Sequence, residues 1–307
     1  MNSNQTQKTQ RTLPVWLAYI MLLSTALFWS GTTIIGRAAT GEIPPFTLSF
    51  LRWVLAFIVF IPFGFGAFWS QRNIYSAYWG RMIGFSFFGI VGFTVLFFLG
   101  LQHTSAINGS LLQAANPVII VLTSLAILGI KLSFSEIIGT ILAILGSTLI
   151  VVHGDVSQLF ELEFGLGDIL VVLSMLSWAI YTVGLKWRPA GLDATGFIFV
   201  LAALSIPMML PFYLWELAQG QTFEANLVNL SLITYSAVFA SVVAYLFWNL
   251  SVEVVGPNIA GLSHYLIPVF GTLMSVFILG EVIETYHIIA IVIIFAGLYL
   301  ATRNREH

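Results

Sequence analysis

Three amides and a proline interrupt an otherwise apolar stretch in the first half of the chain. Residues 111–125 read LLQAANPVIIVLTSL, with Gln113, Asn116 and Pro117 inside the stretch and Asn108 just before it. At about 100° per residue, the three amides fall on one broad face of a helix. Pro117 lacks an amide hydrogen and frees the carbonyl of Gln113. These groups either bond neighbouring helices or line a water-filled cavity that binds a polar molecule, and the freed carbonyl favours the cavity.

One cation and one imidazole lie in similar apolar surroundings. Arg52 falls within the apolar run 43–64, about 13 Å from the start of the run at about 1.5 Å per residue. Ionisable groups at that depth are costly and are functional candidates by default. Two roles stay open for Arg52: bonding to carbonyl groups at a helix break, or pairing with an anionic group of a substrate. His264 is either a proton relay or a neutral side chain satisfied by a neighbour.

The composition places these groups in a membrane. The chain has 307 residues, of which 59% are hydrophobic and 8% charged, whereas a soluble domain carries about 25% charged residues. So few charges cannot cover a soluble surface, so an integral membrane protein is predicted. A net charge of -2 does not indicate a basic surface for nucleic acid. The lack of Cys excludes disulfides and thiolate chemistry.

Ten apolar runs have the length of about 20 residues that a membrane span needs. Their approximate limits are 15–36, 43–64, 80–101, 106–129, 134–152, 167–187, 194–216, 230–250, 257–279 and 285–302. If the N-terminus lies in the cytoplasm, the Lys and Arg residues of the connections lie on the cytoplasmic side, with the exception of Arg37. We therefore predict a multi-pass protein of the inner (plasma) membrane with both termini cytoplasmic.

The spans fall into two related halves. A shift of about 150 residues places Trp29 on Trp178, Pro117 on Pro268 and Gly146 on Gly297. Five spans are an odd number, so the second half enters the membrane from the opposite side. The predicted fold is all-α, with ten transmembrane helices as two five-helix inverted-topology repeats. The predicted limits are 1–14 for a cytoplasmic tail, 15–152 for the first repeat, 153–166 for an extracytoplasmic connection, 167–302 for the second repeat and 303–307 for a cytoplasmic tail.

Three stretches carry a family resemblance. They are ALFWSGTTIIGRAATGEIPPFTLSFLRWVLAFIVFIPF (26–63), LQHTSAINGSLLQAANPVIIVLTSLAILG (101–129), and LGE (279–281) followed by AGLYL (296–300). They resemble the drug/metabolite transporter superfamily in its EamA-type branch, and the likeness covers nearly the whole chain as two EamA units. The resemblance implies an inner-membrane carrier of small metabolites, often an exporter, with its cavity between the two halves.

Aromatic residues join the polar ones in the predicted cavity. Most membrane Trp and Tyr residues belong to interface belts, to which Trp16, Trp53, Trp69, Trp79 and Trp215 are assigned. Trp29 and Trp178 differ, because they are repeat mates. The predicted substrate-binding residues are Trp29, Ser30, Thr33, Arg52, Asn108, Gln113, Asn116, Trp178, Tyr181, Tyr245, Trp248, Asn249, His264 and Tyr265, with helix breaks at Pro117 and Pro268.

These features predict a carrier that works by alternating access and exports amino acids or related compounds. A nucleoside, vitamin or drug-like aromatic substrate is the alternative within carriers, and a membrane-embedded accessory subunit without transport is the alternative class. Glu136, Asp168, Glu253 and Glu281 fall at span ends, so the usual carboxylate proton relay is missing. Downhill or exchange transport is expected, or weak coupling through His264.

The remaining expectations concern chemistry and partners. The nucleotide-binding pattern G-x-x-x-x-G-K-[ST] and the zinc pattern H-E-x-x-H do not occur. We expect no enzyme activity, cofactor, metal, nucleotide or nucleic acid. The expected partners are a small-molecule substrate and the lipid bilayer. Because one chain contains both halves of the site, a monomer or weak dimer suffices.

Overall fold

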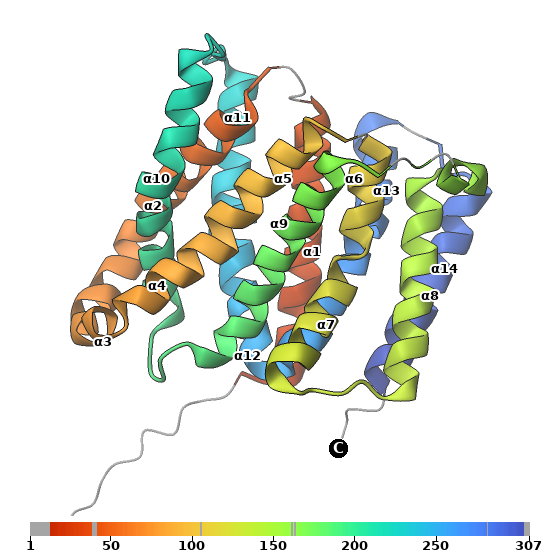
Figure 1. Cartoon of the computed structure of the whole chain (residues 1–307), viewed down its shortest axis with the longest axis horizontal. Coiled ribbons are helices and arrows are strands. Elements are labelled where there is room, and N and C mark those ends of the chain that lie inside the picture. Colours follow the sequence, from red (N-terminus) through yellow and green to blue (C-terminus); the bar gives the residue numbers. More distant parts are fainter. Residues whose placement is uncertain are drawn as a thin grey trace, which may run out of the picture.

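The chain folds into helices that run across one thick layer (Figure 1). The computed structural model describes residues 13–38, 42–104, 106–160, 162, 164–280 and 282–303, apart from the side chains of 33–38, 106–107 and 278–279. The described residues contain helices and no strand, which confirms the all-α prediction. The side chains of Thr33 and Arg37 lie outside the description.

The helices have the following bounds. The α-helices are α1 Val15–Ala38, α2 Pro45–Ser70, α3 Arg72–Ala77, α4 Trp79–Ser86, α5 Phe93–Leu101, α6 Ala106–Ala114, α7 Asn116–Leu128, α8 Phe134–Val151, α9 Leu166–Gly184, α10 Ala194–Ala218, α11 Leu227–Tyr235, α12 Ala244–Leu262, α13 Leu266–Leu279 and α14 Thr285–Thr302. Two π-helices, η1 Phe87–Gly92 and η4 Ser236–Val243, and three 3₁₀ helices, η2 Val156–Phe160, η3 Leu185–Trp187 and η5 Ser263–Tyr265, complete the set among the described residues.

The number of membrane crossings depends on two irregular places. By length and apolarity, the described residues contain eight candidate spans, or nine if the bent pair α6–α7 is one span. One candidate is Leu227–Phe277, with 51 residues, which at about 1.5 Å per residue is far longer than a hydrocarbon core of about 30 Å requires. Gly256, with φ 83° and ψ 165°, divides this run, and α12 reaches the lower edge of Figure 1 while α11 and α13 lie near the upper edge. Division at Gly256 yields the predicted ten spans, and that count stays a prediction.

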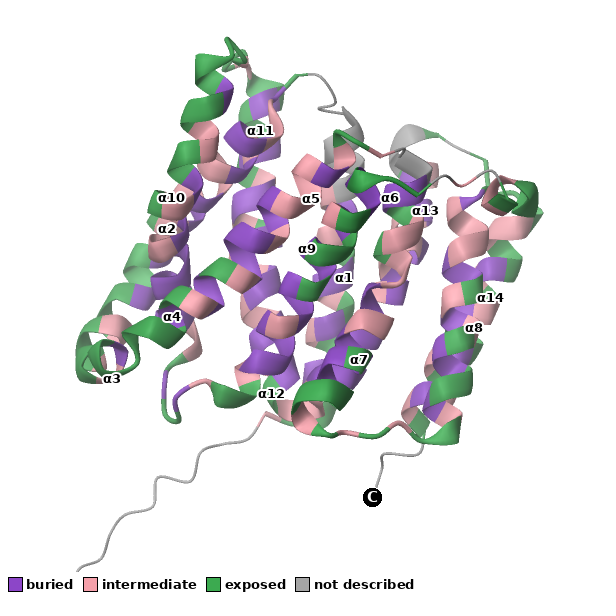
Figure 2. Ribbon diagram, viewed as in Figure 1, coloured by how far each residue is buried: buried purple, intermediate pink, exposed green. Residues whose placement is uncertain are grey.

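The two halves interlock across their boundary. Helix α1 packs on α12 and α13, while its counterpart α9 packs on α5 and α7. The remaining close pairs join counterparts directly, α2 with α10 and α8 with α14. Buried residues gather on the inner helices α9 and α12 (Figure 2). Of the α9 window Leu166–Trp187, 61% is buried, against 22% for α14, so any site between the halves is formed by the inner helices.

Helices α8 and α14 cross through small residues. A Cβ added to Gly146 would lie 2.7 Å from the carbonyl oxygen of Ala290, and one added to Gly297 would lie 2.5 Å from that of Gly139. Gly297 is the repeat mate of Gly146 and Ala290 that of Gly139, since 297 − 146 equals 290 − 139. The same contact therefore occurs twice in opposite directions, as a two-fold axis between the repeats requires.

A buried carboxylate joins α10 to the start of α2. Glu216 is 1% exposed and accepts hydrogen bonds from the backbone N–H groups of Phe46 at 2.9 Å and Thr47 at 2.6 Å, and from the Thr47 hydroxyl at 2.8 Å. The first amides of a helix have no partner within the helix, and a carboxylate there also complements the helix dipole. Glu216 is thus a cap that one repeat supplies to the other.

Basic residues mark one edge of the molecule. The connections around α3, between α7 and α8 and between α9 and α10 lie along the lower edge of Figure 1, as do both ends of the described chain. They carry Arg72, Lys131, Lys186, Arg188 and Arg303. The positive-inside rule predicts that such an edge faces the cytoplasm, and this orientation stays a prediction.

The α8–α14 crossing predicts a matched pair of glycine variants. Gly146→Ala should lower the free energy of unfolding by about 1–3 kcal/mol, because its Cβ meets backbone that cannot move aside. Gly84→Ala is the control, since no heavy atom lies within 4 Å of its added Cβ. Thermal unfolding of both variants in detergent measures the difference, and equal midpoints would contradict the close crossing.

Candidate functional site

Aromatic side chains from both repeats meet at the centre of the protein. The rings of Trp29 (α1) and its mate Trp178 (α9) lie 5.4 Å apart between centroids, edge to face. Trp248 (α12) lies 5.4 Å from each of them, and Tyr245 lies 5.5 Å from Trp178. Residues related by a two-fold axis touch only near that axis. The ring cluster of Trp29, Trp178, Tyr245 and Trp248 therefore lies where the repeats meet.

His264 belongs to the same centre. Its ring stacks on Trp29 at 5.3 Å and meets Trp248 edge to face at 4.8 Å. Its Nδ1 lies 3.1 Å from the carbonyl oxygen of Gly261. A carbonyl only accepts, so Nδ1 carries hydrogen and Nε2 of the neutral ring is an acceptor. This geometry favours the neutral histidine satisfied by a neighbour.

Broken helices surround the ring cluster. Helices α6 and α7 meet at 45° just before Pro117, and the 3₁₀ turn η5 precedes Pro268. The hydroxyl of Ser30 lies 2.8 Å from the carbonyl oxygen of Ile267, next to the second break, and 2.7 Å from that of Ala26. Paired breaks at matching positions are typical of carrier binding sites.

Two π-helices, η1 and η4, lie at matching positions in the repeats, and no sequence pattern predicted them. Trp29 Nε1 donates to the carbonyl oxygen of Ala240 in η4 at 3.1 Å. The hydroxyls of Ser177 and Tyr245 donate to the carbonyl oxygens of Phe88 at 2.8 Å and Gly89 at 2.9 Å, both in η1. Each donor belongs to the repeat opposite the π-helix that it contacts. Such turns occur frequently at functional sites.

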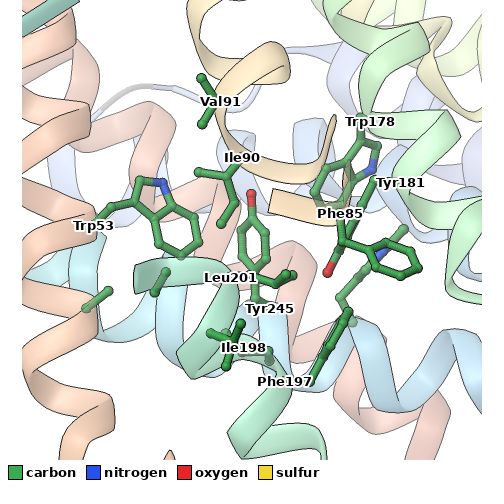
Figure 3. Close-up of a cluster of buried hydrophobic side chains, with 14 of the residues drawn as sticks. Trp53, Phe85, Ile90, Val91, Trp178, Tyr181, Phe197, Ile198, Leu201 and Tyr245 are labelled. Carbon is green, nitrogen blue, oxygen red and sulfur yellow. The ribbon is translucent and has the colours of Figure 1, made fainter. Parts of the chain in front are cut away.

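Tyr181 and Asn249 form a polar pair beside the rings. The Tyr181 hydroxyl donates to Asn249 Oδ1 at 2.7 Å, and Asn249 Nδ2 donates to the carbonyl oxygen of Tyr245 at 2.8 Å. Figure 3 shows Trp178, Tyr181 and Tyr245 converging with apolar side chains of neighbouring helices. The pair orients Tyr181 against the ring cluster.

Arg52 lies next to this centre without an acid. Its side chain is partly buried, and its guanidinium carbon lies 5.5 Å from the centroid of the Trp53 ring. The guanidinium is also close enough to Tyr245 for an electrostatic interaction. Within the described chain, Arg52 has no ion pair, and its buried Nε has no hydrogen-bond partner. The carbonyl partners expected for a purely structural arginine are therefore not found in this part of the chain.

The predicted amides do not assemble as one face of the site. Asn108 is buried and donates a hydrogen bond to Asp168 at the start of α9, beside Thr104. Gln113 is exposed. Only Asn116 is both buried and placed on α7, which contacts α9 and η5; its Oδ1 has no partner among the described residues.

Tyr265 also lies apart from the ring cluster. It is buried in a second apolar cluster, which includes Ala143 and Ile294 on α8 and α14. The structure therefore brings together Trp29, Ser30, Arg52, Trp178, Tyr181, Tyr245, Trp248, Asn249 and His264 from the predicted set.

The assignment of Trp53 to an interface belt is wrong. Trp53 is 0% exposed, and its ring meets Tyr245 at 5.0 Å and 90°. Trp16, Trp69, Trp79 and Trp215 are exposed, as a belt requires. The sequence held a signal for Trp53, because it adjoins Arg52 at about 13 Å depth in its run, too deep for an interface.

The arrangement of the repeats and of the site defines a class of protein. Two interlocked inverted repeats, broken helices and an enclosed centre on the axis between them are the architecture of a membrane carrier. The model of the EamA-like transporter family matches residues 16–152 and 165–303, and the chain belongs to this family. The predicted resemblance is thereby confirmed.

Relatives from distant organisms agree with this class. The chain is 27% identical over 300 residues to the uncharacterized transporter YyaM of Bacillus subtilis, covering 92% of this chain and 93% of the relative. It is 28% identical over 297 residues to an uncharacterized transporter of Archaeoglobus fulgidus, covering 94% and 98%. A solved crystal structure with 20% identity superposes with a TM-score of 0.77 over 94% of this chain and 99% of its own, and supports the fold. The protein is thus a multi-pass membrane transporter, and only the site can indicate its substrate.

The burial of Trp53 predicts a large effect of its removal. Trp53→Ala should lower the free energy of unfolding by about 3–5 kcal/mol, because it empties a fully enclosed site. Trp79→Ala is the control at an exposed tryptophan, 44% accessible, where a change within about 0.5 kcal/mol is expected. Denaturation in detergent measures the free energy of unfolding of both variants. An unchanged free energy of unfolding for Trp53→Ala would support the original assignment of Trp53 to the interface belt.

The environment of His264 predicts how transport responds to a proton gradient. Its ring contacts are aromatic and its bonded neighbour in the described chain is a backbone carbonyl, so a proton has no carboxylate to move to. Transport into proteoliposomes should be indifferent to an imposed pH gradient, both before and after His264→Gln. The control is His103→Gln at an exposed position. Acceleration by the gradient that His264→Gln alone abolishes would establish a relay.

Proposed function

We propose that this protein moves small polar metabolites across the inner (plasma) membrane by alternating access and exports amino acids or related compounds. The observation that carries the proposal is Arg52, a partly buried cation that lacks an acid partner in the described chain and lies beside the ring cluster. A charge without a partner in the interior is unfavourable. A substrate carboxylate would supply the partner, because a guanidinium binds it bidentately.

Alternating access is supported by the symmetry of the repeats. Two interlocked halves with one axis can exchange conformations and open the same centre first to one side and then to the other. The basic connections favour an orientation with both termini in the cytoplasm. Both halves of the site belong to one chain, which fits a monomer or weak dimer.

A second substrate class is favoured by the rings themselves. Trp29, Trp178 and Trp248 offer aromatic faces on which a flat ring could stack, as in a nucleoside, a vitamin or a drug-like aromatic compound. A nucleoside is uncharged and gives Arg52 no anion. The carboxylate therefore ranks first, and the nucleoside is the alternative that the transport experiment addresses.

Counterflow in proteoliposomes tests the proposal directly. Proteoliposomes that contain the protein and are loaded with unlabelled amino acids should accumulate labelled amino acids. Arg52→Gln should reduce the transport rate per molecule about 10–100-fold, since hydrogen bonds to charged groups contribute about 1.5–3 kcal/mol. Arg52→Lys should retain part of the rate, because it keeps the charge and loses the bidentate geometry. Arg72→Gln, at an exposed position outside the spans, is the control.

Two results would contradict the proposal. Lost abundance of Arg52→Gln with normal activity per molecule would show that Arg52 acts in folding alone. Counterflow of nucleosides without that of any amino acid or related acid would select the alternative substrate.

A further inference from the structure

The centre of the protein holds hydrogen-bond donors without acceptors. In the part of the chain that the structure describes, four buried N–H groups here have no partner: Arg52 Nε, Trp53 Nε1, Trp178 Nε1 and Trp248 Nε1. Indole and guanidinium nitrogens donate and do not accept. Buried donors normally find a partner, and each exception requires an explanation.

The four donors belong to one connected group of side chains. Arg52 lies 5.5 Å from the Trp53 ring, and Trp53 meets Tyr245 at 5.0 Å. Tyr245 in turn lies 5.5 Å from Trp178, which lies 5.4 Å from Trp248. The four unpartnered donors therefore belong to one packed group of side chains at the centre.

No acid balances this surplus. The buried acids among the described residues are Glu136, Asp168 and Glu216. Each already accepts hydrogen bonds at a helix start: Glu136 from Ser133, Asp168 from Gly165, and Glu216 from the first turn of α2. The side-chain acceptors beside the rings are neutral, namely Nε2 of His264, Oδ1 of Asn249 and the hydroxyl oxygen of Tyr245.

From this charge balance we infer that the site selects small carboxylic acids whose amino group is absent or acylated, over free amino acids. Aryl keto acids, aryl hydroxy acids and N-acylated amino acids belong to this class. The inference rests on the proposed function and specifies its substrate.

The physical reason lies in the two ends of the substrate. A carboxylate accepts from the unpartnered donors and neutralises Arg52. A free ammonium group would add a second positive charge where no carboxylate can pair with it, and the ring faces compensate only in part. The same rings accommodate an apolar or aromatic body well. A monoanion leaves the filled site neutral, whereas a zwitterion leaves it with the charge of Arg52.

A ligand series with one aromatic body and different charges tests the inference. Binding of 3-phenylpropionate, N-acetylphenylalanine, phenylalanine and phenethylamine to the full chain in lipid nanodiscs is measured by calorimetry. The first two should bind at least tenfold more tightly than phenylalanine, and phenethylamine should bind most weakly. Phenylalanine or phenethylamine binding as tightly as the acids would overturn the inference.

Variants then locate the preference in the named donors. Trp53→Phe and Trp178→Phe keep an aromatic ring and remove the N–H, and each should weaken 3-phenylpropionate several-fold while changing phenethylamine little. Arg52→Gln should reduce the difference between 3-phenylpropionate and phenylalanine to less than threefold. Trp79→Phe is the control, because Trp79 is exposed and is not one of the unpartnered donors. Equal effects of Trp79→Phe and Trp178→Phe would contradict a role for the donors.

The outcomes separate this inference from the proposed function. If phenylalanine is transported and binds more tightly than both acids, the proposed function stands and the inference is wrong. If no member of the series binds and nucleosides show counterflow, the proposed function itself fails.

Discussion

Backbone carbonyl groups within a membrane need donors from the protein, because the hydrocarbon supplies none. Trp29, Ser177 and Tyr245 supply them at the two π-helices, and Ser30 supplies one beside the break at η5. Every one of these donors comes from the opposite repeat. The irregular helices and the interlocking of the repeats therefore depend on each other, and any relative movement of the repeats must change the bonding of the π-helices.

The outer and inner helix pairs use different means of association. Helices α8 and α14 approach through glycine and alanine, and Glu216 caps α2 from α10. These contacts fix the pairs at either end of the layer in Figure 1. Between them lie bulky rings that contact one another through edges and faces, without the close backbone contact of the small-residue crossing. The enclosed centre is thus the part of the axis suited to rearrangement.

The fold was more accessible from the sequence than the site. Hydropathy located the spans, and the landmarks Trp29, Pro117 and Gly146 revealed the repeat, because their mates have the same residue type. Side-chain direction was harder. A straight helix would place Asn108, Gln113 and Asn116 on one face. In the bent pair α6–α7, Gln113 is exposed, and the side chain of Asn108 bonds to Asp168 at the start of α9. The π-helices have no established sequence signature, and Glu216 became significant only once α2 was found beside it.

The symmetry of the backbone does not extend to the chemistry of the site. The repeat mate of Arg52 is Leu201, since 201 − 52 equals 178 − 29, and Leu201 is buried and apolar. Likewise, exposed Gln113 is the counterpart of His264 within the rings. Under the proposed function, an acid with an apolar body would bind in one orientation, with its anion at Arg52 on α2 and its body at the rings. Two equivalent halves can therefore supply the motion proposed for the carrier, while only the first repeat supplies a cation, Arg52, at its centre.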